Sequence, residues 1–278
     1  MKKQLLIAII SISLVCCLFF FGKTTTSNKS IQPAKMGPVS TFDITQLIDN
    51  QKKTLSASQK SKLLSIENFS KEPSADDLYT LAAYWKDSIH SMEAYSFYIS
   101  KASKLENSEK SLTFAAQLFL NLLRGEENAK KLEWETNEAI DLFQKAIAIN
   151  PNNDDLRIGL GSCYIFGKGR NGNPQETMQG ILEVLSVVRK DSNNMKAQLV
   201  LGIGGFVSGQ YDKAVARLEK VISKEPGNLE AVAFLADTYA AKGDNNNALK
   251  YYELSKRLAN DPHYSKEVDD RIKELKIR

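Results

Sequence analysis

The sequence has few of the residues that build catalytic or metal centres, with three cysteines and two histidines in 278 residues. Cys16 and Cys17 lie inside an apolar run, which leaves Cys163 alone in the rest of the chain. No disulfide within that part and no metal-ligand spacing can therefore be assembled. We interpret Cys163 as a small buried residue in a helix. His90 and His263 lack an H-E-x-x-H pattern, so we expect both at the surface.

Nucleotide-binding loops and catalytic motifs are also missing. The glycines at 202–205 do not complete a dinucleotide loop, because Val207 stands where the last glycine belongs and no strand precedes it. The turn at 167–174 lacks the G-K-[ST] ending of a phosphate loop, and no haem motif C-x-x-C-H is present. No serine–histidine–acid set can be assembled. We therefore predict no enzymatic activity, no cofactor, no metal and no small-molecule substrate.

Excess positive charge is confined to the start of the chain. The formal net charge is +4, but residues 1–71 carry ten lysines against three acidic residues. The remainder holds 27 basic and 30 acidic residues, so it is slightly acidic. A nucleic-acid-binding face needs a basic patch on the folded part. We therefore predict that nucleic acid is not a partner.

The chain does contain an internal repeat, and it is clearest from Met195 onward. Two apolar helical patterns, 197–207 and 211–222, flank a break at 208–210, and Pro226-Gly227-Asn228 ends the second. The same pattern then starts again 34 residues later: Leu201-Gly202 recurs as Leu235-Ala236, and Ala214 recurs as Ala248. A fixed period of this size indicates an array of helical repeats.

These residues resemble the tetratricopeptide repeat (TPR), whose pattern is W-x2-L-G-x2-Y, A-x3-F and P. Leu201, Gly202, Ala214 and Pro226 match it. The resemblance implies an all-α fold, a right-handed superhelical solenoid of antiparallel helix pairs. It also implies that the small residues Gly202 and Ala214 let the two helices of a pair approach closely.

Five repeats are predicted in residues 74–262, at 75–108, 109–153, 154–194, 195–228 and 229–262. Against a period of 34 residues, the second carries about eleven extra residues between its helices, at 124–136, and the third about seven. Asn153, Asn194 and Asn228 are predicted N-caps of the first helices that follow them. A helical hairpin at 42–73 and a last helix at 263–278 are predicted to cap the array.

The N-terminal segment 1–23 is predicted to be a membrane anchor. Its apolar run from Leu5 to Gly22 is about as long as the shortest spanning helices. A cleaved signal peptide is the alternative, but Phe19-Phe20-Phe21 stands where a cleavage site needs small residues. Lys2 and Lys3 place the start in the cytoplasm. We therefore expect a single-pass protein of the bacterial inner membrane, with a flexible linker at 24–41 and periplasmic repeats.

The resemblance also implies a concave face formed by the first helices of the repeats. In the two central repeats the inward positions are apolar, which predicts a protein-binding surface. Its members are Ile158, Ser162, Ile165, Phe166, Leu199, Ile203, Phe206 and Val207. Either the segment 167–179 folds over them or a client does. Lys168 and Arg170 in that segment are further candidate contacts.

The predicted function is a non-enzymatic scaffold that binds peptide or helix segments of other proteins at the cell envelope. Two alternatives stay open. One is a passive structural subunit of an envelope complex, and the other is a client-holding factor similar to those of cytochrome c assembly, an analogy at the level of the fold. The partner itself is not identified.

Overall fold

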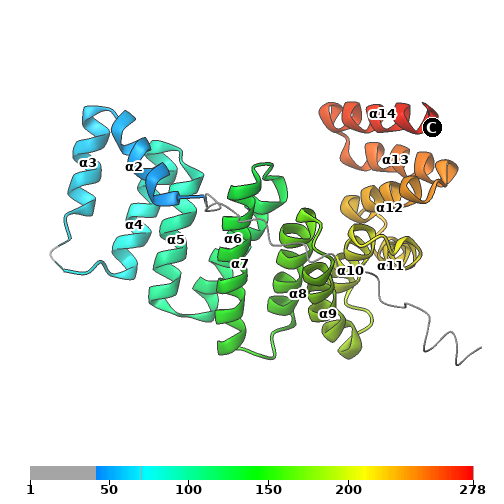
Figure 1. Cartoon of the computed structure of the whole chain (residues 1–278), viewed down its shortest axis with the longest axis horizontal. Coiled ribbons are helices and arrows are strands. Elements are labelled where there is room, and N and C mark those ends of the chain that lie inside the picture. Colours follow the sequence, from blue (N-terminus) through cyan, green and yellow to red (C-terminus); the bar gives the residue numbers. More distant parts are fainter. Residues whose placement is uncertain (1–41, 70, 278) are drawn as a thin grey trace, which may run out of the picture. The chain divides into compact units, whose positions relative to one another are not determined.

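The computed structural model describes residues 42–69 and 71–277, and this part contains 13 α-helices and no strand (Figure 1). The prediction of an all-α fold is thereby confirmed, whereas the right-handed superhelical path stays a prediction. The predicted anchor, 1–23, and linker, 24–41, lie outside the described residues. None of the described helices is both long enough and apolar enough to span a membrane.

Helices follow one another in pairs. We call α4, α6, α8, α10 and α12 the first helices and α5, α7, α9, α11 and α13 the second helices. Each second helix contacts its own first helix and the first helix that follows, except that α13 contacts α14. The bounds are α4 Ala75–Tyr84, α5 Met92–Glu106, α6 Glu109–Gly125, α7 Ala129–Ile149, α8 Asp154–Cys163, α9 Pro174–Lys190, α10 Met195–Val207, α11 Tyr211–Lys224, α12 Leu229–Lys242 and α13 Asn245–Ala259.

Asparagine caps fix where the first helices begin. The side chain of Asn153 accepts a hydrogen bond from the Asp155 amide, and those of Asn194 and Asn228 accept from amides three residues ahead. All three predicted caps are confirmed. They satisfy amides that a helix start otherwise leaves without a partner. The second helices α7 and α9 begin in the same way, at Asn128 and Asn173.

The extra residues of the second and third repeats do not form long loops, which corrects the prediction. In the second repeat they lengthen the helices, because α6 ends at Gly125 and α7 begins at Ala129, giving helices of 17 and 21 residues. In the third repeat, α8 and α9 are joined by a π-helix, η2 Tyr164–Lys168, and a 3-10 helix, η3 Gly169–Asn171, in place of a long loop. A π-helix, η1 Trp85–Ile89, also follows α4 of the first repeat, which carries no extra residues, so the π-helix itself is not the insertion.

Helical elements lie at both ends of the array. The hairpin of α2 Ile44–Thr54 and α3 Ala57–Glu67 contacts α5 and α4, and the Phe42 ring lies 5.3 Å from the Trp134 ring of α7. At the other end, α14 Pro262–Ile277 packs on α13 and buries Val268 and Ile272. These apolar contacts cover pair faces that would otherwise be exposed, as the last unit of an array requires.

Small residues let the helices of a pair approach closely. A Cβ added at Gly202 of α10 would lie 2.7 Å from Leu218 Cγ of α11, and one at Gly205 would lie 3.2 Å from Ala214 Cβ. In the preceding pair, a Cβ at Gly161 would lie 2.7 Å from the Gly180 carbonyl oxygen. The predicted close approach at Gly202 and Ala214 is confirmed, although Gly202 meets Leu218 and Ala214 meets Gly205.

We predict that Gly202→Leu lowers the free energy of unfolding by about 1–3 kcal/mol, because the added side chain overpacks the buried Leu218 contact. Gly125→Leu is the matched control, since Gly125 ends a helix and a Cβ there meets nothing within 4 Å. Urea denaturation measures both. Equal midpoints for the parent and both variants would show that the α10–α11 contact is not as tight as described.

A buried carboxylate in α7 lies in an acidic cluster. Lys131 forms ion pairs with Glu93 at 2.8 Å and Glu126 at 2.9 Å, which leaves Glu135 at 4.0 Å. The side chain of Glu135 is 1% exposed, and its Oε2 has no hydrogen-bond partner among the described residues. Burial is the main cause that raises the pKa of Glu135 from 4.5 to about 7, and Glu126 and Glu93 add to it while Lys131 opposes it.

This cluster makes stability depend on pH. Because the pKa of Glu135 is higher in the folded chain than in the unfolded chain, its stabilising effect is complete below pH 4.5 and is lost as pH rises towards 7. Glu135→Gln removes the buried charge, so it should raise the free energy of unfolding at pH 8 by about 1–3 kcal/mol, with a smaller gain at pH 5. Urea denaturation at the two pH values tests this. Glu133→Gln, at an exposed position of the same helix, is the control and should leave the free energy of unfolding unchanged at both pH values. An equal gain at pH 5 and pH 8 for Glu135→Gln would contradict a raised pKa of Glu135.

Candidate functional site

Five of the eight residues predicted to form the binding face are enclosed in the core, which corrects the predicted surface. They are Ile158, Ser162, Ile165, Phe166 and Ile203, exposed by 8% or less. Close stacking of the helices is the reason. Ile165 packs against Gly204 of α10 and Gly180 of α9, and a Cβ added at either glycine would come within 3.1 Å of the Ile165 side chain. Leu199, Phe206 and Val207 remain half-buried, and their contact with a client stays a prediction.

The cover over Phe166 comes from α6. The Arg124 guanidinium lies 4.3 Å from the centroid of the Phe166 ring, and it forms an ion pair of 2.8 Å with Glu230 of α12. This pair joins residues 106 positions apart in the chain. It therefore links the last turn of α6 to the first turn of α12. A cation above an aromatic ring is attracted to it, so Arg124 both shields Phe166 from solvent and stabilises the contact.

The segment 167–179 contributes to this cover indirectly. Arg170 donates hydrogen bonds to the carbonyl oxygens of Leu123, at 3.1 Å, and Arg124, at 3.4 Å. These carbonyls belong to the last turn of α6, where a helix has acceptors without intrahelical donors. Arg170, predicted as a partner contact, is therefore occupied in holding the last turn of α6. Lys168 is half-buried, and its role as a contact stays a prediction.

A hollow remains beside Phe206, between α10, α12 and α14. Its volume is about 350 Å³, and its lining residues are Phe206, Asp237, Ala240, Ala241, Tyr252, Arg271, Glu274 and Leu275. The Phe206 ring lies 5.8 Å from the Phe234 ring and 6.3 Å from the Tyr211 ring. The half-buried Phe206 ring therefore packs against aromatic rings of α11 and α12 and also lines the hollow.

The polar side of this hollow is a fixed hydrogen-bonded group. Arg271 Nη1 donates to both carboxylate oxygens of Asp237, at 2.8 and 2.9 Å, and the Tyr252 hydroxyl donates to Asp237 at 2.6 Å. Burial, followed by the hydrogen bond to Asp237, raises the pKa of Tyr252 above its usual range. The part played by Arg271 depends on how α14 docks, which no local pattern reveals.

The arrangement suits recognition of a protein segment. The lining combines apolar side chains with a few hydrogen-bonded polar groups, and all project from packed helices. The volume admits one large side chain of a partner. Sequence reasoning placed Phe206 on the predicted binding face, but it missed the hollow because Tyr252, Arg271 and Leu275 belong to later helices.

Comparisons with known proteins identify the repeat. Residues 208–266, which contain α11, α12 and α13, match the family model described as tetratricopeptide repeat. No curated protein matches the chain. A thermophilic TPR protein of Thermus thermophilus is similar in structure, with 17% identity and a TM-score of 0.54, covering 74% of this chain and 100% of its own. A tetratricopeptide repeat protein of Parabacteroides merdae has 18% identity and a TM-score of 0.51, covering 84% and 96%.

At these identities the two structures are evidence for the fold alone, and the family model covers only the C-terminal part of the described chain. Together with the paired helices and the 34-residue period, they establish a helical-repeat fold like that of TPR proteins, with a tetratricopeptide repeat segment at residues 208–266.

Proposed function

We propose that the chain is a non-enzymatic scaffold that binds peptide or helix segments of partner proteins. The observation that carries this proposal is the hollow beside Phe206, whose lining also contains the hydrogen-bonded group of Asp237, Arg271 and Tyr252. Aromatic side chains supply most of the binding energy at many protein interfaces, and they do so best when packing holds them rigid.

The charged residues of this hollow favour a segment that combines an apolar anchor with polar neighbours. Arg271 is neutralised by Asp237, and Glu274 adds a carboxylate to the lining. An apolar side chain of the partner would lie against Phe206 and Leu275, and its backbone amides would find acceptors at the polar edge. The mode is that of a short segment docking in a groove formed by helices.

We further propose that this scaffold acts at the bacterial cell envelope, anchored by residues 1–23 with its repeats outside the cytoplasm. The apolar run from Leu5 to Gly22 and the lysines before it support the proposal. Such an anchor would keep the repeats close to membrane-associated partners, separated from the bilayer by the segment 24–41.

The anchor leads to a fractionation prediction. Full-length protein should stay in the inner-membrane fraction after alkaline or high-salt washing, because a spanning helix does not depend on ionic contacts. Protease should reach the repeats only from the extracytoplasmic side. A mature, soluble protein that begins near residue 23 would refute the anchor and favour a cleaved signal peptide.

The docking site leads to a binding prediction. A partner is first identified by affinity purification from membranes and mass spectrometry, and is then rebound in purified form. Phe206→Asp should weaken its affinity by about a hundredfold, because a charge replaces a central aromatic contact worth about 2–3 kcal/mol. Thermal unfolding is measured in parallel, so that loss of the fold is recognised.

Phe97→Asp is the matched control, since Phe97 is also half-buried but lies on α5, outside the hollow. The proposal predicts that its affinity stays near that of the parent. Equal weakening by both substitutions, or none by Phe206→Asp in a folded protein, would place the docking site elsewhere. A few stoichiometric partners that never dissociate would favour the alternative of a structural subunit.

A further inference from the structure

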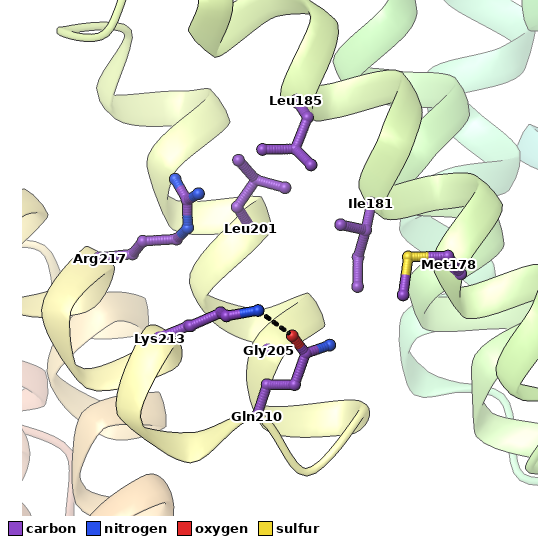
Figure 2. A pocket seen from close by; sticks show the side chains of 8 residues that line it. All are labelled: Met178, Ile181, Leu185, Leu201, Gly205, Gln210, Lys213 and Arg217. Atoms are coloured by element: carbon purple, nitrogen blue, oxygen red, sulfur yellow. Dashed lines mark hydrogen bonds between the residues drawn. The ribbon is translucent and has the colours of Figure 1, made fainter.

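A second hollow lies between α9 and α11, away from the residues around Phe206 (Figure 2). Its volume is about 250 Å³. Figure 2 shows Met178, Ile181 and Leu185 of α9 on one side, and Lys213 and Arg217 of α11 on the other. Leu201 and Gly205 of α10 form its floor, and Gln210 lies at one end. The hollow therefore has one apolar wall and one basic wall.

The basic wall has no counter-charge within the described part of the chain. Lys213 Nζ donates to Gln210 Oε1 at 2.7 Å, and Arg217 Nη1 donates to Gln198 Oε1 at 2.6 Å. Both acceptors are neutral amides, and neither cation forms an ion pair with a described carboxylate. Partial burial lowers the pKa of Arg217, because desolvation disfavours its charged form. A carboxylate of a partner, placed beside Arg217, would stabilise the charged form of its side chain.

The acidic residues of α11 point to other neighbours. Asp212 pairs with Lys242 of α12, and Glu219 accepts a hydrogen bond from the Tyr239 hydroxyl at 2.9 Å. The acidic side chains of this helix thus contact the following pair, while Lys213 and Arg217 face the preceding one. The helix is therefore divided by charge, and its basic side is the one that borders the hollow.

The apolar wall is open enough for a partner to reach. Met178 is 44% exposed, and Leu182, on the same helix, is 54% exposed. A designed cavity of about 150 Å³ in another protein binds benzene, so a hollow of this size accepts an aliphatic or aromatic side chain. Its depth depends on Gly205, which carries no side chain and lets α11 approach α10.

We infer that this hollow binds an acidic amphipathic segment of another protein, with one apolar side chain against Met178, Ile181 and Leu185 and one or more carboxylates against Lys213 and Arg217. An apolar wall offers nothing to a phosphate backbone, so the combination favours protein over nucleic acid. The inference does not rest on the function proposed for the hollow beside Phe206, because the two sets of lining residues share no member.

A designed peptide tests the inference. The probe is a fluorescent synthetic helix with leucine at positions i, i+3, i+4 and i+7 and glutamate beside them, and its sister peptide carries lysine in place of every glutamate. Each is titrated with the full-length chain while anisotropy is recorded. The acidic peptide should bind saturably, and the lysine peptide at least about tenfold more weakly, because its charge repels the basic wall.

Substitutions locate the peptide. Met178→Asp and Lys213→Glu should each weaken binding of the acidic peptide by roughly tenfold. The first places a negative charge on the apolar wall, and the second reverses a charge on the basic wall. Lys213→Glu should also narrow the difference between the two peptides. The matched controls are Leu105→Asp, at an exposed leucine of α5, and Lys224→Glu, at the exposed end of α11, and both should bind like the parent.

Several outcomes would overturn the inference. One is that the acidic peptide shows no saturable binding, and another is that both peptides bind with equal affinity. A third is that the control variants weaken binding of the acidic peptide as much as Met178→Asp and Lys213→Glu do. Direct binding of a DNA duplex that Lys213→Glu abolishes, with no peptide binding, would assign the basic wall to phosphates instead. Phe206→Asp should leave the peptide affinity unchanged, so this test and that of the proposed function fail independently.

Discussion

The close approach of the two helices within each pair is the constraint on which the central repeats depend. At Gly161 and Gly180, and again at Gly205 and Ala214, backbone or Cβ atoms of facing helices come so near that a larger side chain would have to push them apart. Packing at this density is sensitive to a single added methylene. The second helices α5, α7, α9 and α11 each contact the next first helix as well as their own, and the helices up to α10 share an extensive core.

That stacking also determines which surfaces a partner can reach. It encloses Ile158, Ile165 and Ile203, and the Arg124–Glu230 ion pair covers Phe166. Hollows remain at the borders between pairs, and two of them differ in charge. One lies beside Phe206 and has a neutralised polar group, whereas the other lies beside Met178 and has cations without acidic partners among the described residues. This difference in charge supports the proposal that the two hollows bind different segments.

Local patterns predicted much of the fold because their physical causes are local. The 34-residue period follows from one helix pair per repeat, and Asn153, Asn194 and Asn228 mark helix starts because their side chains satisfy amides two or three residues ahead. The site was harder to predict. Apolar residues at inward positions indicated a binding face, but Ile165 is buried by close stacking against Gly180 and Gly204, and Phe166 is covered by Arg124. The insertions were misplaced because a longer helix and a longer loop have the same residue count.

The central claim is that this helical-repeat fold binds other proteins through the hollow beside Phe206. The most direct measurement places a photoreactive amino acid at position 206 of the full-length chain in living cells and identifies its adducts by mass spectrometry. Position 101, at an exposed residue of α5, serves as the reference. The account predicts a defined protein adduct from position 206 and none of comparable yield from position 101. Equal labelling from both positions, or no protein adduct from position 206, would contradict it.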